Sequence, residues 1–305
     1  MDNNPLSISL AGLQLQNPTM LASGVLGYTA ESFERVAKAG AGAVVTKSVG
    51  SQPRPGYANP TVVQAESGLI NAMGLPNPGI DVFAGEIKET KLTLRVPLIV
   101  SVFGYSAEDY AAVAKKAVEA GADAVELNVS CPHVKQTGSE IGQNPKLLSE
   151  VVLQVKSAIN KPLIAKLSPN VSDITVLARA AIEAGADALT AVNTLRAIAI
   201  DTETQLPILN NTKGGLSGAA IKPVALRAVY DIADAFEIPI IGCGGVTNWR
   251  DAVEFFLAGA SAVQIGTAVA DDIEVFQSVS KGIENYLRRK HARSVEDIVG
   301  LAHRK

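Results

Sequence analysis

Two pairs of small residues near the end of the chain are placed where a phosphate group could bind. Gly244 and Gly245 follow an apolar run that ends at Cys243, and Gly266 and Thr267 follow the next such run. Because glycine has no side chain, its backbone N–H can approach an anion closely. The alternative is that these glycines only make tight turns. Two such pairs together favour a phosphate-binding site.

Two lysines, Lys47 and Lys166, stand at the ends of other apolar runs, and neither has an acid beside it in the sequence. In a partly dry pocket an ammonium group balances an anionic ligand or intermediate. It can also form a Schiff base with a carbonyl substrate. A lysine can equally extend to water from the surface. If Lys47 and Lys166 face the same pocket, their pairing favours a role in ligand binding.

Three asparagines offer amide groups suited to the edge of an imide or carboxamide ring. They are Asn71, Asn128 and Asn193, of which the last two stand directly at the ends of apolar runs. Asparagine is also common in turns. The position of Asn128 and Asn193, rather than their residue type, is what indicates ligand binding.

The chain has two cysteines, and only one is placed for chemistry. Cys131 lies in a loop between Ser130 and Pro132, where a thiol can act as a base or nucleophile. Cys243 ends an apolar run and is predicted to be a packing residue. His133 could be an acid–base group, a ligand contact or a plain loop residue. No cluster has metal-ligand spacing, so no metal site is expected.

A repeated string predicts the elements that position these residues. Ala-Gly-Ala-x-Ala occurs four times, each time between a stretch with helical periodicity and a short apolar run. The glycine is suited to the left-handed residue that ends a helix. Apolar runs that begin with proline alternate with these copies. The copies span residues 39–43, 120–124, 184–188 and 258–262, and the proline runs span 18–22, 97–100, 162–165 and 239–241.

The alternation amounts to eight short buried strands separated by helices, which predicts a parallel sheet. The sheet could be closed as a barrel or open and doubly wound. The eight units favour closure, and so does the lack of a G-x-G-x-x-G string leading from a strand into a helix. We expect residues 1–305 to form a single α/β domain, a (β/α)8 TIM barrel with long insertions at the carboxyl ends of its strands. Active sites of such barrels lie at that end.

Composition excludes several classes of protein. Of the 305 residues 47% are hydrophobic and 19% charged, which is typical of a globular chain. The net charge of −3 gives no basic field for nucleic acid or an anionic membrane. Two cysteines are too few for a disulfide scaffold or a four-cysteine iron–sulfur cluster. No signal peptide or membrane span is predicted, so a cytoplasmic protein is expected.

The order of these strings resembles that of the dihydroorotate dehydrogenases, the flavoenzymes of pyrimidine synthesis. With a cysteine at position 131, the chain resembles family 1 of these enzymes. The membrane-associated family 2 has a serine at that position and carries an N-terminal extension. The stretch from Asn193 to Gly218 and the loop NVSCPHVKQTG resemble class 1B, the NAD+-linked form. The matching strings are LASG at 21–24, TKS at 46–48, NAMGLPNPG at 71–79, NVSCP at 128–132, AKLSPN at 165–170, VNT at 192–194, GGLSG at 214–218, GCGG at 242–245 and IGTA at 265–268.

The resemblance implies a role for individual residues. Cys131 would be the base that removes a proton from C5 of dihydroorotate while a hydride leaves C6 for FMN. The residues implied for FMN are Ser23, Lys47, Ser48, Ser101, Asn128, Lys166, Val192, Gly218, Gly244, Gly245, Gly266 and Thr267. The residues implied for the pyrimidine are Lys47, Asn71, Ala72, Met73, Gly74, Leu75, Asn128, His133, Asn193 and Thr194.

The resemblance also implies a partner. Class 1B enzymes pass electrons to NAD+ through a second subunit that carries FAD and a [2Fe–2S] cluster. We therefore expect this chain to form the homodimeric core of a heterotetramer. Its own two cysteines and its lack of a dinucleotide fingerprint agree with cofactors held by another chain.

Other functions remain open from the sequence. His133 stands where family 1 usually has asparagine, and the string SCPH also occurs in dihydropyrimidine dehydrogenases, which act on uracil-type bases. A fumarate-linked class 1A enzyme is a second alternative. A Schiff-base aldolase using Lys47 or Lys166 would leave Cys131 unexplained. A non-catalytic barrel that only binds a partner would, like the aldolase, be colourless.

Overall fold

The computed structural model describes residues 4–129 and 141–304. Among these residues, eight parallel strands close into a barrel in the order β10-β15-β16-β3-β4-β7-β8-β9. This ring follows the chain order, so each strand lies beside its predecessor. The barrel strands are β3 (Thr19–Leu21), β4 (Ala43–Val45), β7 (Leu98–Val102), β8 (Ala124–Asn128), β9 (Leu163–Leu167), β10 (Ala188–Ala191), β15 (Ile240–Cys243) and β16 (Ala262–Ile265). The predicted (β/α)8 TIM barrel is confirmed.

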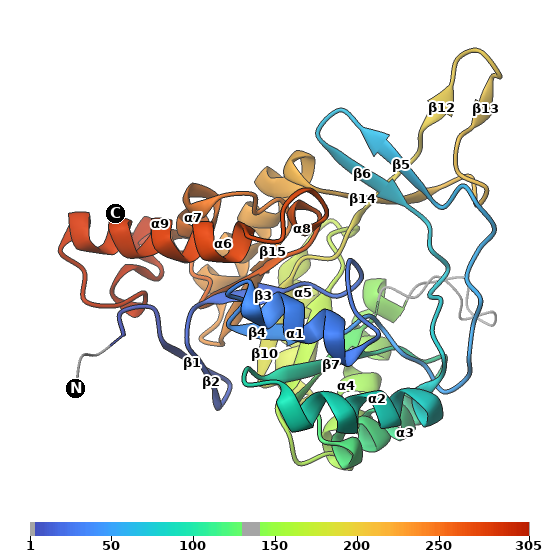
Figure 1. The fold of residues 1–305 in the computed structure, drawn as a ribbon, viewed down its shortest axis with the longest axis horizontal. Helices are drawn as coiled ribbons and strands as arrows, with labels where there is room; N and C mark the ends of the chain where they lie inside the picture. The colour runs from blue at the N-terminus through green and yellow to red at the C-terminus, as the bar shows by residue number, and fades with distance from the viewer. Residues whose placement is uncertain (1–3, 130–140, 305) are drawn as a thin grey trace.

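Helices surround the barrel (Figure 1). Four of the turns into barrel strands use the predicted glycines, with φ of 97° at Gly40, 115° at Gly121, 100° at Gly185 and 112° at Gly259. A left-handed glycine ends each helix without the clash that a Cβ would cause. The helices are α1 (Ala30–Lys38), α2 (Ile80–Thr93), α3 (Ala107–Ala120), α4 (Pro145–Ala158), α5 (Ile174–Glu183), α6 (Lys222–Ala235), α7 (Trp249–Leu257), α8 (Ala268–Asp271) and α9 (Val275–Lys290).

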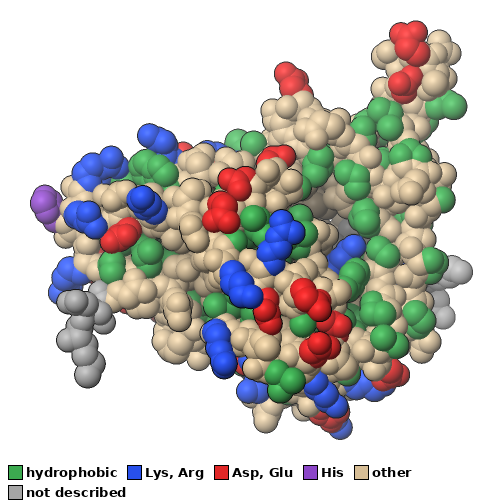
Figure 2. Space-filling model, viewed as in Figure 1, with side chains coloured by type: hydrophobic (Ala, Val, Ile, Leu, Met, Phe, Trp, Pro, Cys, Tyr) green, Lys and Arg blue, Asp and Glu red, His purple; other side chains and the backbone are tan. Residues whose placement is uncertain are grey.

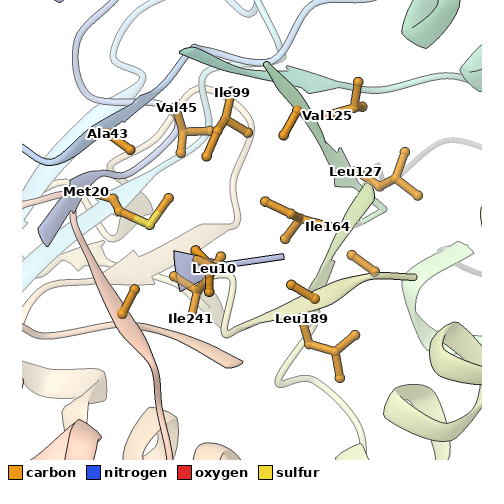
Figure 3. Packing of buried hydrophobic residues seen from close by; sticks show 14 of the residues in the cluster. Leu10, Met20, Ala43, Val45, Ile99, Val125, Leu127, Ile164, Leu189 and Ile241 are labelled. Carbon is orange, nitrogen blue, oxygen red and sulfur yellow. The ribbon is translucent and has the colours of Figure 1, made fainter. Parts of the chain in front are cut away.

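The hydrophobic core fills the barrel and the layer between strands and helices. An antiparallel hairpin of β1 (Ile8–Leu10) and β2 (Leu13–Leu15) precedes β3. Its Leu10 is fully buried and lies among Met20, Ile164 and Ile241 (Figure 3). Because β2 leads into the start of β3, this hairpin covers the amino end of the barrel.

Insertions build a second layer over the carboxyl end. A four-stranded antiparallel sheet has the order β11-β14-β6-β5, and a short hairpin of β12 and β13 extends beyond it (Figure 1). Strands β6 and β14 are far apart in the sequence, with Asn71 paired to Gly215, 144 residues further along. The added strands are β5 (Val62–Ala65), β6 (Gly68–Asn71), β11 (Leu195–Ala197), β12 (Ile200–Asp201), β13 (Leu206–Pro207) and β14 (Gly214–Ser217). We refer to the four-stranded sheet as the overhang.

Candidate active site

A cavity of about 620 Å³ opens between the carboxyl ends of the barrel strands and the overhang. This volume is typical of a ligand pocket. Figure 2 shows the surface hollowed beside the overhang, with basic side chains at the hollow. All twelve residues that the sequence predicted for FMN line this cavity. Of the set predicted for the pyrimidine, the lining residues are Lys47, Asn71, Met73, Leu75, Asn128, Asn193 and Thr194.

Four predicted residues are not brought to the cavity wall by the described structure. Ala72 and Gly74 belong to the loop after β6 but are not among the lining residues. Cys131 and His133 lie outside the residues that the structure describes. Their roles stay predictions from the sequence.

A row of hydroxyl and amide groups crosses the cavity wall at the ends of neighbouring strands. Asn128 Nδ2 donates to Ser48 Oγ at 2.9 Å, and Ser48 Oγ lies 2.9 Å from Ser101 Oγ. Asn193 Nδ2 donates to Asn128 Oδ1 at 3.2 Å. These bonds fix the orientation of both amides, because the nitrogen and the oxygen of each asparagine already have one partner, the Asn193 oxygen through the N–H of Thr194 at 2.8 Å. These side chains can form hydrogen bonds with a ring that carries both hydrogen-bond donors and acceptors.

The two glycine pairs present unsatisfied backbone donors. In the described part of the chain, the N–H groups of Gly244, Gly245, Gly266 and Thr267 donate to no acceptor. Gly244 and Gly245 have φ of 128° and 79°, a backbone conformation that side chains disfavour. These four residues are partly exposed, so their N–H groups can donate to solvent or to a bound ligand. Their convergence at one end of the cavity fits an anion such as a phosphate monoester.

Lys166 lies at the floor of the cavity inside the barrel and is 6% exposed. Its Nζ donates to Gln264 Oε1 at 2.8 Å and lies 3.7 Å from Glu126 Oε1. Burial alone lowers the pKa of this ammonium group, but the Glu126 carboxylate and, once it is ionised, the Cys243 sulfur raise the pKa above that of a free lysine. Although no acid stands beside Lys166 in the sequence, the fold brings one to it. This acid is Glu126 from the adjacent strand β8, and the contact between the two residues cannot be predicted from their spacing in the sequence.

Lys47 has a different environment. It is half-buried after β4, and its Nζ lies 5.0 Å from the centre of the Tyr28 ring, a cation–π geometry. Burial lowers the pKa of Lys47 below that of a free lysine. Burial also raises the pKa of Tyr28 to about 12, so this phenol stays neutral and supplies only its ring. A desolvated ammonium of this kind attracts an anionic ligand strongly.

Three residues next to Lys166, one of which lines the cavity, were missed or misread from the sequence. Cys243 was predicted to be a packing residue, yet it lines the cavity beside Lys166. Glu126 and Gln264 were read as parts of apolar strands. A charged residue in the middle of a buried strand is rarely found without a partner. That acid in an otherwise apolar run was the signal available for Glu126.

Polar contacts at the cavity hold the overhang together and join it to the barrel. Within the overhang, Asn71 Nδ2 donates to Gly215 O at 3.3 Å, and Thr267 Oγ1, which follows barrel strand β16, donates to Ser217 Oγ of β14 at 2.9 Å. Below the overhang, Asn77 Oδ1 accepts from the N–H groups of Gly50 and Gly79. The loop between Asn71 and Gly79 is thereby fixed over the mouth of the cavity. It can close one side of a bound ligand.

Comparison with known proteins assigns this architecture to a family. The family model described as dihydroorotate dehydrogenase matches residues 5–287. The chain belongs to the dihydroorotate dehydrogenase family. The resemblance drawn from the sequence strings is thus confirmed.

Relatives within the dihydroorotate dehydrogenase family match over nearly the whole chain. Proteins named dihydroorotate dehydrogenase B (NAD(+)), catalytic subunit, are 52% identical in Methanocella arvoryzae and 54% identical in Pyrococcus horikoshii. The first match covers 98% of each chain and the second covers 97% of each. The protein of the same name from Thermococcus kodakarensis is 56% identical over 97% of this chain and 98% of its own.

A solved structure shares the dihydroorotate dehydrogenase fold. The crystal structure of DHODH from Eimeria tenella in complex with ferulenol aligns with a TM-score of 0.85 and covers 100% of this chain and 90% of that one. At 24% identity it supports the fold alone. Within the described residues, no helix is long and apolar enough to cross a membrane, and no group of three or more potential metal ligands occurs.

Proposed function

We propose that this chain is the catalytic subunit of an NAD+-linked dihydroorotate dehydrogenase, which oxidises dihydroorotate to orotate in pyrimidine biosynthesis. The observation that carries the proposal is the identity of 52–56% with relatives of that name over nearly their full length. The cavity at the carboxyl end of the barrel supports it, because it combines an anion site, a buried ammonium and an amide row.

We propose FMN as the cofactor, bound by the whole chain as one barrel domain. The unpaired N–H groups of Gly244, Gly245, Gly266 and Thr267 fit a monophosphate, and Lys166 on the floor fits the electron-rich end of a flavin ring. When bound, FMN supplies the hydride acceptor of the reaction. The residues proposed to hold it are the twelve that line the cavity: Ser23, Lys47, Ser48, Ser101, Asn128, Lys166, Val192, Gly218, Gly244, Gly245, Gly266 and Thr267.

The substrate is proposed to be held by side chains that the structure places around the same cavity. Lys47 balances the carboxylate of dihydroorotate, and Asn71, Asn128 and Asn193 read the ring amides. The other residues proposed for the pyrimidine are Ala72, Met73, Gly74, Leu75, His133 and Thr194. Because Asn128 and Asn193 are bonded to each other, the second N–H and the second oxygen lone pair of each amide are oriented before the ligand arrives.

Cys131 is proposed as the base that takes the proton from C5. It stands three residues after the last residue of β8, Asn128, in the sequence. An ordinary thiol has a pKa of about 8.5, so a cysteine is partly thiolate near neutral pH and can remove a proton. Asn128 would then hold the ring while the thiolate acts on it.

The cofactor proposal is tested on the purified chain. We expect a visible absorption spectrum with flavin maxima, and heat-released cofactor that comigrates with FMN in chromatography. FAD would contradict the monophosphate site. A colourless protein that cannot be loaded with FMN would favour the aldolase or the non-catalytic barrel.

A second subunit is proposed to carry the electrons onward. The word "subunit" in the relatives' name applies to those proteins, and it supports a separate electron-transfer chain here. We propose that this partner holds FAD and a [2Fe–2S] cluster, and that two barrel chains form the centre of a heterotetramer. The described residues offer no cluster of metal ligands for such a group.

The electron-transfer proposal predicts a divided activity. The chain alone should reduce dyes with dihydroorotate but not NAD+, and adding the partner should establish NAD+ reduction. NADH production by this chain alone would contradict the proposal. Rapid turnover with fumarate would indicate class 1A instead.

The sequence string SCPH favours a second candidate, a reaction on uracil-type bases. The two candidates differ in the carboxylate of the substrate, which Lys47 would neutralise. Comparing the reduction of the bound flavin by dihydroorotate and by dihydrouracil decides between them. Preference for dihydrouracil would replace the substrate proposed here.

A further inference from the structure

A buried carboxylate lies below the cavity, where the mechanism so far gives it no role. Glu126 comes from β8 and is fully buried. Its Oε2 accepts from Thr190 Oγ1 at 2.9 Å and from Gln264 Nε2 at 2.5 Å, and its Oε1 has no hydrogen-bond partner among the described residues. That oxygen lies 3.7 Å from Lys166 Nζ. Four barrel strands thus contribute one polar cluster to an otherwise apolar interior.

The hydrogen bonds of this cluster have one consistent direction. Gln264 accepts from Lys166 through Oε1 and donates to Glu126 through Nε2. Turning the amide over would place its NH2 against the ammonium and its oxygen against the carboxylate. The observed arrangement therefore suits a charged Lys166 and an ionised Glu126.

The groups around Lys166 leave Glu126 as its countercharge. Thr190 from β10 and Gln264 from β16 are neutral. Cys243 from β15 also lies beside Lys166, but burial raises the pKa of its thiol, so it is uncharged at neutral pH. An isolated buried ammonium would lose its proton, because burial penalises the charged form.

We propose that Glu126 is a positioning residue that keeps Lys166 protonated at the floor of the FMN site and thereby limits how strongly the reduction potential of FMN depends on pH. This inference rests on the proposed FMN site. A permanently charged Lys166 favours the reduced, more negative flavin at every pH at which the enzyme works. Without Glu126, Lys166 would lose its proton as the pH rises and would regain it when FMN is reduced.

The test is the FMN midpoint potential of the loaded protein between pH 6 and 9, for wild type and Glu126→Gln. If one extra proton is taken up together with the two electrons, the equilibrium constant between oxidised and reduced FMN changes by up to a further tenfold for each pH unit. This corresponds to about 30 mV. We expect the plot of potential against pH to be steeper for Glu126→Gln by up to this amount. Parallel plots would overturn the inference.

Two further variants identify the proton and control for the mutation. Adding Lys166→Met to Glu126→Gln should return the slope to that of wild type, and a steep slope that persists would place the proton elsewhere. Asp123→Asn makes the same chemical change at the amino end of β8, where Asp123 Oδ2 accepts from Lys91 Nζ at 2.6 Å. It should leave the slope unchanged.

Folding of the variants is itself informative, because a buried charge left without its partner strongly destabilises the folded protein. If Glu126→Gln alone does not fold, folded protein from the double variant supports the inference. Failure of both would give Glu126 a structural role only. Absence of FMN from the wild type would instead refute the proposed function, so the two failures are distinguishable.

Discussion

The two ends of the barrel differ in whether their charged groups and hydrogen-bond donors are paired within the protein. At the amino end, Asp187 accepts from the N–H of Leu163 at 2.7 Å and from Lys156 Nζ at 2.6 Å. Asp123 repeats the arrangement with Leu98 and Lys91. Each aspartate there joins the start of a strand to the helix that precedes it. Charges and donors at that end are matched within the protein.

At the carboxyl end, donors are left for a ligand. The N–H groups of Gly244, Gly245, Gly266 and Thr267 donate to no acceptor in the described chain, and Lys47 lies against a neutral ring. The comparison indicates that one end of the scaffold is built for stability and the other for binding, as is typical of this barrel architecture.

The largest effect is expected in the loop that follows β8 at the carboxyl end. Cys131→Ala should slow reduction of the flavin by dihydroorotate by roughly 10²–10⁴, the usual size of a general-base effect. Binding of FMN and orotate should persist, because the thiol is proposed to act on the proton only. Stopped-flow spectroscopy at neutral pH measures this rate. A variant as fast as wild type would remove Cys131 from the mechanism.

The next effect concerns Lys47 and depends on pH. Lys47→Met should weaken orotate binding by about ten- to a hundredfold, since a hydrogen bond to a charged group contributes about 1.5–3 kcal/mol. Because burial lowers its pKa, Lys47 loses its charge at a lower pH than a free lysine. Wild-type orotate affinity should therefore fall as the pH rises toward 10. The same fall in Lys47→Met would assign the titration to another group.

A change at the amino end should affect stability alone. Asp187→Ala removes hydrogen bonds to Leu163 and Lys156, and the side chain is 33% exposed. We expect the free energy of unfolding to fall by about 1–2 kcal/mol, less than for a fully buried charged group. Asp187→Asn, which can still accept from Leu163, should lose less. Denaturant unfolding and dihydroorotate turnover are measured together, and a slower turnover per folded molecule would contradict the division between the two ends.

The smallest effect is expected for His133. A protonated imidazole donates to a carboxylate or carbonyl more strongly than a neutral one. Orotate affinity should therefore change by a few-fold between about pH 6 and 8, with tighter binding at the lower pH. His133→Asn should flatten this change in a calorimetric titration. Identical profiles for both proteins would make His133 a plain loop residue.

The sequence by itself determined the barrel and the end that carries the site. Strand and helix patterns are local, since a buried strand needs only a short apolar run and a helix end needs a residue such as Gly121 in the left-handed conformation. The order of the strands then follows from the right-handed connections of parallel strands. The glycine pairs, Lys47, Asn128 and Asn193 could be predicted as one group because the ends of parallel strands meet at one edge.

Only the tertiary structure decided which side chains meet inside the barrel. Glu126 reaches Lys166 because β8 and β9 pair with Asn128 opposite Lys166, and Gln264 joins them from 138 residues further along the chain. The overhang likewise pairs Asn71 with Gly215. Such contacts depend on register and on barrel closure, which bring distant segments together and leave no periodic pattern in the sequence.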